Sequence, residues 1–303
     1  MRSIGDLGEA HAGRRRAPSE WTPRVHRLLL LSLAALPLAV SHAAEWSDTF
    51  LGWRYGTKFA EPFGATDIHK NILSLTHASG YKYGSNFFNA DVLLSDSRDP
   101  GFDTTAGAQE IYVLYRNTVD AGKVAGRDFK AGVVRGWGVT GGFDLNSKND
   151  AYGSKKRMLV LGPTLMLDVP GFLNLSLLAL FESNAPRGVD RYTYKTHAAF
   201  EADWSTPLPV PAVPLAFEGY ALHIASKGAN EFGGPTAPET HLDMKLMADV
   251  GAVTGIGKNT FKVGIGYEYW RNKFGNPTKL YAEGGGGDGA TASTPMIRVE
   301  YHF

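Results

Sequence analysis

The segment "FLNLSLLALFE", residues 172–182, alternates between two kinds of side chain. One parity carries apolar residues alone: Leu173, Leu175, Leu177, Ala179 and Phe181. The other parity holds the polar residues of the segment: Asn174, Ser176 and Glu182. Successive side chains of a β-strand point to opposite faces of the sheet. The segment therefore predicts a strand with one apolar face and one partly polar face.

The same alternation recurs along the chain in segments of about ten residues, the length of a tilted membrane-spanning strand. Helical spacing is scarce by comparison. Twelve strands are predicted, near residues 47–57, 69–79, 85–95, 109–118, 128–142, 156–169, 172–183, 192–205, 214–226, 239–251, 260–272 and 294–303.

Two of these strands leave open which residues face outward. In 128–142, Trp137 and Val139 share a parity with Arg135, a residue that is costly at the middle of a lipid bilayer. In 214–226 two outward sets are compatible with the pattern: Leu215 with Phe217, or Tyr220 with Leu222 and Ile224.

The connections between the predicted strands alternate in length. Polar segments rich in Gly and Pro follow the odd-numbered strands, such as "DSRDPGFDTTAGAQ" after strand 3 and "DLNSKNDAYGSK" after strand 5. Mostly shorter ones follow the even-numbered strands, such as "GYKYG" and "PG". Long external loops and short periplasmic turns, with both termini on the periplasmic side, are typical of outer-membrane barrels.

The N-terminal residues are predicted to be a targeting segment. "RVHRLLLLSLAALPLAVSHAAEW" has basic residues, then an apolar run from Leu28 to Val40, then small residues. This is the pattern of a secretory signal peptide, cleaved near Ala43 or Ala44. We therefore divide the chain into a signal peptide with an extended basic region, residues 1–44, and a barrel, residues 45–303.

Composition excludes several classes of site. The chain has 303 residues and no cysteine, so it forms no disulfide and has no thiolate nucleophile. Its formal net charge of +1 argues against binding of a nucleic acid polymer, which favours a basic excess. The nine histidines form no recognised metal-binding motif, and "GGGGDG" is neither a P-loop nor a calcium loop. We expect no cofactor and no metal.

The last predicted strand, "MIRVEYHF", residues 296–303, has the same two-faced character. Ile297, Val299, Tyr301 and Phe303 alternate with Arg298 and Glu300. In lipid, only helices and closed barrels satisfy all backbone hydrogen bonds. Together with the signal peptide and the loop asymmetry, the pattern predicts an all-β fold: an antiparallel, up-and-down transmembrane β-barrel of about 12 strands. The final strand is expected to close it by pairing with the first, near Trp53.

Three stretches carry a family resemblance: "WSDTFLGWRYGTKFAEPF", "GYKYGSNFFNADVLLSDSRDP" (residues 80–100) and "IRVEYHF". They resemble the Tsx-like nucleoside-specific channels of Gram-negative outer membranes, most closely over residues 46–118. The resemblance implies a monomeric barrel that takes up nucleosides or similar small solutes passively. It also implies that Phe303 is a signal for the barrel-assembly machinery, and that outer-membrane lipid surrounds the barrel.

The inward phase of the strands gives the candidate binding residues. Aromatic rings stack on bases, and polar side chains bond to base edges and hydroxyls. We expect a series of weak lumen sites formed by Arg54, Phe87, Asn89, Asp91, Tyr112 and Arg116. Further inward groups are Lys195, His197, Glu201, Asp203, Asp243, Lys245, Glu268, Arg298 and Glu300. For each charge, pairing across the lumen is the competing and more common role.

Two other functions remain open from the sequence. A barrel phospholipase would use a lipid-facing Ser with a His, and Ser74, Ser176 and His223 are available, without a nucleophile motif. A rim protease would use Asp and His, for which Asp190, His69 and His241 are available. A structural or receptor barrel without useful conductance is the third class. We predict a channel and no enzymatic activity.

Overall fold

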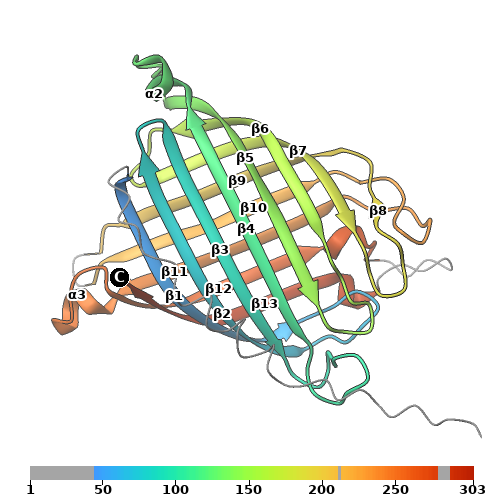
Figure 1. Cartoon of the computed structure of the whole chain (residues 1–303). Coiled ribbons are helices and arrows are strands. Elements are labelled where there is room, and N and C mark those ends of the chain that lie inside the picture. The colour runs from blue at the N-terminus through green and yellow to red at the C-terminus, as the bar shows by residue number, and fades with distance from the viewer. Residues whose placement is uncertain (1–43, 211–212, 279–286) are drawn as a thin grey trace, which may run out of the picture. The chain divides into compact units, whose positions relative to one another are not determined.

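The computed structural model describes residues 44–210, 213–278 and 287–303, which form a closed antiparallel β-barrel of twelve long strands and one short extra strand (Figure 1). The strands are β1 (Ala44–Phe59), β2 (Ile68–Tyr81), β3 (Gly84–Ser95), β4 (Gln109–Asp120), β5 (Val134–Lys148), β6 (Arg157–Leu167), β7 (Phe172–Asn184), β8 (Tyr192–Thr193), β9 (His197–Leu208), β10 (Leu215–Ile224), β11 (Glu239–Asp249), β12 (Phe261–Arg271) and β13 (Thr291–His302). The predicted signal peptide lies outside the described residues, apart from Ala44, which begins β1.

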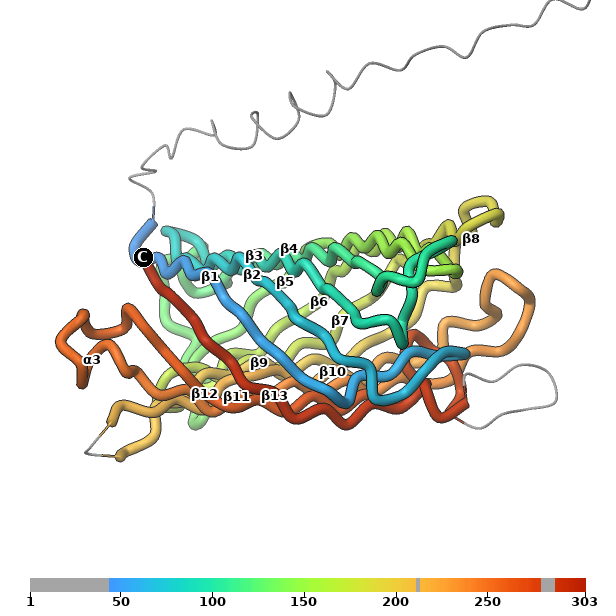
Figure 2. Tube along the Cα trace, turned by 90° about the horizontal axis from the view of Figure 1, so that it is seen from below, coloured from blue at the N-terminus to red at the C-terminus, as the bar shows by residue number. Residues whose placement is uncertain are grey.

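Sequence neighbours pair around the whole barrel, and the two ends of the chain close it. The sheet order runs β6-β5-β4-β3-β2-β1-β13-β12-β11-β10-β9-β7, and β6 pairs with β7. β1 pairs with β13 in the register Trp53↔Val299, which confirms the predicted closure. Figure 2 shows β1 and β13 running side by side.

The short helices are α2 (Ala121–Ala125) and α3 (Val250–Thr254), and the 3-10 helices are η1 (Lys273–Gly275) and η2 (Asp288–Ala290). Within the described ranges, no helix is long and apolar enough to cross a membrane. We call the end with α2, α3 and Phe303 the turn end, and the end with β8 the loop end (Figure 1).

The prediction of strand 128–142 was wrong by six residues at each end, because β5 runs from Val134 to Lys148. Residues 128–133 of the predicted strand instead belong to the connection that begins with α2. The Asp120 carboxylate accepts hydrogen bonds from the amides of Gly122 and Lys123, and Gly126 ends the helix in the left-handed conformation. The last part of β5, "DLNSK", looks like a loop because four of its five residues are polar, but Asp144, Asn146 and Lys148 lie on the inward parity.

The predicted strand 192–205 is also divided. β8 covers only Tyr192–Thr193 and pairs with the end of β7, whereas β9 begins at His197. Lys195 therefore lies in the connection and not on a strand. Tyr194, in the same connection, is buried, and its hydroxyl donates to Glu231.

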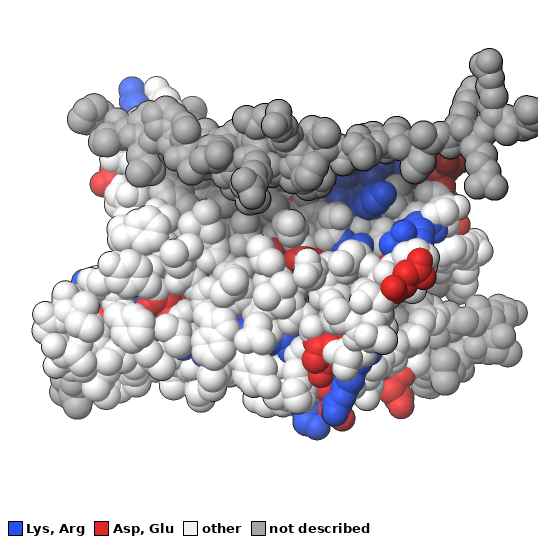
Figure 3. Space-filling model, turned by 60° about the horizontal axis from the view of Figure 1, so that its bottom comes forward, with Lys and Arg blue, Asp and Glu red and all other residues white. Residues whose placement is uncertain are grey.

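The outer surface is apolar over the middle of the barrel. Ile265, Leu159 and Leu177 have exposed fractions of 63%, 61% and 58%. One face of the molecule is largely free of Lys, Arg, Asp and Glu, which gather toward one side of the view (Figure 3). Such a belt, on a closed barrel with no free strand edge, is the surface that a lipid bilayer can surround.

The structure resolves both phase ambiguities. Trp137 and Val139 face outward, and Arg135 shares their face but lies at the second residue of β5, at the turn end. In β10, Phe217 faces outward, whereas Tyr220 and Ile224 face the interior. At that end of β5 the Arg135 charge would lie near the interface of a surrounding bilayer, where an arginine costs little.

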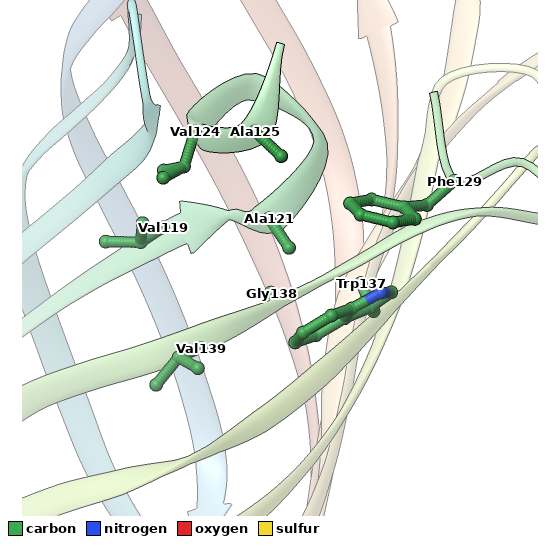
Figure 4. Close-up of a pocket in the computed structure, with 8 residues that line it drawn as sticks. All are labelled: Val119, Ala121, Val124, Ala125, Phe129, Trp137, Gly138 and Val139. Carbon is green, nitrogen blue, oxygen red and sulfur yellow. The ribbon is translucent and has the colours of Figure 1, made fainter. Parts of the chain in front are cut away.

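A small apolar pocket of about 310 Å³ lies outside the lumen, where α2 folds toward β4 and β5 (Figure 4). Its lining residues are Val119, Ala121, Val124, Ala125, Phe129, Trp137, Gly138 and Val139. At this pocket the helix α2 lies against the barrel rim. The lining is almost entirely apolar, so it offers little to bind a polar solute.

Candidate functional site

The inner wall of the barrel differs from one side to the other. Two apolar clusters lie inside: one of Met158, Val160, Leu178, Leu180, Ala199 and Ile224, the other of Phe59, Ile68, Ile72 and Met296. The remaining inward positions are mainly polar or charged, and many are buried. We take this charged lumen as the candidate site, because it is where a solute could cross an otherwise apolar shell.

Arg54 and Asp91, two of the predicted residues, are brought together from β1 and β3. The Arg54 Nη2 donates to Asp91 Oδ2 at 2.6 Å, and its Nη1 donates to the same carboxylate at 3.4 Å and to Ser74 Oγ at 3.0 Å. Both side chains are largely buried, with exposed fractions of 17% and 10%. The pair is a two-pronged, charge-assisted contact, the strong form of an Arg–carboxylate interaction.

Tyr112 and Arg116, on β4, converge on Asp144 of β5. The Tyr112 hydroxyl donates to Asp144 Oδ2 at 2.7 Å, and the Arg116 Nη1 donates to Asp144 Oδ1 at 2.5 Å. Asp144 was expected in a loop and was missed. Asp144 lies on the same face of the strand as Thr140, and the apolar Leu145 lies on the other face. This alternation is the signal that could have identified Asp144 as an inward residue.

The other two predicted residues, Asn89 and Phe87, lie nearer the turn end on β3. Asn89 Oδ1 accepts a hydrogen bond from Thr76 Oγ1 at 2.7 Å. Phe87 shares the inward parity of Asn89 and Asp91, yet 39% of its surface is exposed. It is therefore an aromatic ring of the inner wall that other side chains leave open.

Further charge pairs lie on β10 to β13. Arg298 Nη2 donates to Asp243 Oδ1 at 2.5 Å. Lys245 Nζ contacts Glu300 Oε1 at 2.5 Å and Glu218 Oε2 at 3.0 Å. All of these were predicted as inward groups except Glu218, which lay in a strand of open phase. The inward charges thus pair mainly with one another.

Gly266 makes room for one of these pairs. A Cβ atom at this position would lie 2.2 Å from Arg298 Nε, so the guanidinium lies directly over the glycine. Arg298, Arg54 and Arg116 each keep a buried Nε with no hydrogen-bond partner in the part of the chain that the structure describes. Because each of these Nε atoms is buried, a solute on the inner wall does not reach it.

An aromatic cluster lies near the loop end. The rings of His241 and Trp270 stack with centroids 3.8 Å apart, and Tyr220 meets His241 edge-on at 5.1 Å. Lys273 Nζ lies 4.6 Å from the Trp270 ring centroid. Trp270 was missed, although its parity with Glu268 places it inside. Because its neighbours already contact it, the cluster is a rigid wall and not an open stacking surface.

A chain of hydroxyl groups crosses the opposite wall. Thr118 and Thr140 are 2.8 Å apart, Thr140 and Thr164 are 2.5 Å apart, and Thr164 and Ser176 are 2.7 Å apart, measured between side-chain oxygens. The four residues come from β4, β5, β6 and β7. They form a polar but uncharged chain across four neighbouring strands, and three of them, Thr140, Thr164 and Ser176, are buried.

The residues considered for hydrolysis are not assembled into a site. Ser74 and Ser176 are buried on the inner wall, with Ser74 bonded to Arg54, whereas His223 lies on the exposed outer face. His69 and His241 contact Asp96 and Glu268, at 3.9 Å in each case, and not Asp190. These placements give no serine–histidine pair on the lipid face.

The chain matches no family model, and no curated protein matches it in sequence. Among solved structures it is similar to KdgM porin, with 10% identity and a TM-score of 0.40 over 84% of this chain and 99% of that one. It is similar to the translocator domain of the autotransporter NalP from Neisseria meningitidis, with 13% identity and a TM-score of 0.43 over 92% and 96%.

It is also similar to an anion-selective porin from Comamonas acidovorans, with 8% identity and a TM-score of 0.33 over 85% of this chain and 99% of that one. These similarities assign no solute to the chain. They do not identify it as a Tsx-like nucleoside channel either, so that resemblance stays a prediction. The fold itself rests on the strand pairing: the chain is a closed, antiparallel twelve-stranded β-barrel with one short extra strand.

Proposed function

We propose that the chain is a passive channel of the bacterial outer membrane for small polar solutes, with nucleosides as the first solutes to test. The observation that carries the proposal is a polar, ion-paired inner wall inside a closed barrel with an apolar exterior. Such a wall lets a solute exchange its hydration for protein groups without a single deep binding site.

Nucleosides suit the groups that remain open on this wall. Phe87 exposes its ring on the inner face, and the side chains of Arg54 and Arg116 keep exposed fractions of 17% and 11%. A base can stack on the ring, and ribose hydroxyls or base carbonyls can accept from the guanidinium groups. The carboxylates of Asp91 and Asp144 are held by their partners, which keeps the arginines in place.

The partners follow from the same proposal. Lipid surrounds the apolar belt, and the barrel-assembly machinery recognises the C-terminal strand that ends in Phe303. The protein acts as a monomer and binds no nucleic acid polymer. It performs no bond chemistry, so it requires no cofactor.

Planar bilayers test the channel. The purified protein is expected to give stepwise conductance that nucleosides reduce in a saturable way. Conductance that nucleosides leave unchanged would reject the nucleoside version and leave a channel for other solutes. The absence of any conductance would reject the channel and favour a structural or receptor barrel.

Phe87 provides the test of the binding surface. Phe87→Ala should weaken the block by nucleosides by about 1–3 kcal/mol, roughly five- to 150-fold in the block constant, the contribution of one stacked base. The matched control is Phe88→Ala, because the neighbouring ring faces the outside of the same strand. Equal block constants for the two variants would show that Phe87 does not contact the solute.

A further inference from the structure

Three lysines surround one carboxylate at the loop end of the barrel. Glu61 lies in the connection between β1 and β2, and its Oε1 is 2.5 Å from Lys70 Nζ, 3.2 Å from Lys273 Nζ and 3.5 Å from Lys148 Nζ. The lysines come from β2, η1 and the end of β5. No exposed fraction among the four residues exceeds 8%.

Other acidic groups balance two of these lysines. Asp99 contacts Lys148 at 2.9 Å and Lys70 at 3.7 Å, and Asp150 contacts Lys148 at 2.9 Å. Glu110 is hydrogen-bonded by Asn146 Nδ2. In the described part of the chain, Lys273 has Glu61 as its only carboxylate partner; its Nζ also donates to the backbone oxygen of Ala60 at 2.9 Å.

The carboxylate comes from a loop and not from the barrel wall. Two non-glycine residues of this loop, Phe63 and Asp67, have φ values of 58° and 57°, a conformation that is unfavourable for them. Burial raises the pKa of Glu61, but the charges of Lys273, Lys70 and Lys148 outweigh it and hold the pKa well below the usual 4.5. The lysines are thus arranged to bind an anionic carboxylate, and the loop supplies one.

We propose that Lys70, Lys148 and Lys273 form a binding site for small carboxylate anions at the mouth of the channel, and that Glu61 is a tethered occupant which an entering anion displaces. The position of Lys273 extends the site inward, because the same ammonium lies 4.6 Å from the Trp270 ring in the lumen. The proposal rests on the channel function and adds anionic solutes to its substrate class.

Chemical rescue tests the site without any measurement of transport. Glu61→Ala should unfold at a lower temperature than the parent protein, and sodium acetate should raise that temperature in a saturable way that sodium chloride of equal ionic strength does not. Asp67→Ala is the matched control, because it removes an exposed carboxylate from the same loop, 2.8 Å from Lys58 Nζ. Equal effects of acetate and chloride on Glu61→Ala would overturn the site. If Glu61→Ala fails to fold, its refolding yield in sodium acetate and in sodium chloride gives the same comparison.

Ion selectivity then separates the site from the channel. Glu61→Gln should raise the anion-to-cation permeability ratio by about two- to fivefold, the effect of one unit charge acting over roughly 4 to 10 Å in water. Lys273→Met should lower the ratio. Rescue by acetate without conductance would reject the channel and retain the site. Conductance with no acetate-specific rescue and an unchanged ratio would reject the site and retain the channel.

Discussion

At the scale of single residues, the lumen is a set of buried ion pairs. Taking two charges out of water costs several kcal/mol per ion, and the mutual attraction offsets this only with good geometry. Arg54 and Asp91 meet that condition through two guanidinium–carboxylate contacts and the support of Ser74. Removing one partner is therefore far worse than removing both.

We expect Arg54→Ala to lower the free energy of unfolding by about 3–5 kcal/mol, because it leaves the Asp91 carboxylate buried without its cation. Equilibrium unfolding of the purified barrel in denaturant measures the change. The double variant Arg54→Met with Asp91→Leu should recover most of the loss. Lys58→Ala, which breaks an ion pair with Asp67 that is about half exposed, should cost less than about 1 kcal/mol. Similar losses at both sites would show that the lumen pair is solvated.

At the scale of elements, the loop between β1 and β2 depends on close contact with η2. A Cβ atom at Gly289 would lie 1.9 Å from the backbone oxygen of Glu61. Only a residue without a side chain allows the two segments to approach this closely. The position of the Glu61 carboxylate is thus set by a glycine more than two hundred residues further along the chain.

Gly289→Ala should displace this loop and lower the free energy of unfolding by about 1–3 kcal/mol, the usual cost of overpacking. It should also shift ion selectivity in the same direction as Glu61→Gln. Gly64→Ala is the control within the loop, because its nearest neighbours would lie 3.4 Å from the new Cβ. A stable Gly289→Ala variant with parental selectivity would contradict the contact.

The contribution of Glu61, in the same loop, to the stability of the fold should change with pH in a direction that follows from its pKa. Because the folded-state pKa of Glu61 lies below its usual value of 4.5, the ionised carboxylate stabilises the fold above about pH 4.5, and this stabilisation is lost as the pH falls from there through the folded pKa. The stability difference between the parent protein and Glu61→Gln should therefore shrink on acidification from pH 7 to pH 3. Thermal unfolding of both proteins across that range measures it. A constant difference would exclude Glu61 as the titrating group.

At the scale of the whole molecule, the pairing of the last strand with the first stabilises the barrel. β13 is the last strand in sequence and lies between β12 and β1, so the barrel has no free edge. Ile297 faces outward from the middle of β13 and is 50% exposed, whereas Arg298 faces inward and is buried. One face of this strand thus joins the apolar outer belt, and the other joins the charged lumen.

Ile297→Arg should cost about 2–4 kcal/mol in a bilayer, since this residue lies on the apolar belt. Ser293→Arg lies on the same face of the same strand but near the loop end, and should cost about 1 kcal/mol or less. Unfolding of the barrel in lipid vesicles compares the two. Equal costs would show that the membrane does not surround the belt as proposed.

Sequence reasoning succeeded where the signal is local. Alternation predicted the outward and inward faces of segments such as 172–182, and the loop asymmetry located most connections. It failed at β5, where residues 128–133 belong to a connection and the mostly polar residues 143–148 continue the strand. It also missed Trp270 and Glu61, whose surroundings are made by other strands.

By itself, the sequence determined an all-β barrel of about twelve strands, because each strand shows the two-residue alternation of apolar and polar side chains independently of its neighbours. The tertiary structure alone decided which charges pair. Asp144 binds residues of β4, and Glu61 binds lysines 9 and 212 residues away, with a third at the end of β5. Such partners depend on strand register and loop packing, which no local pattern encodes.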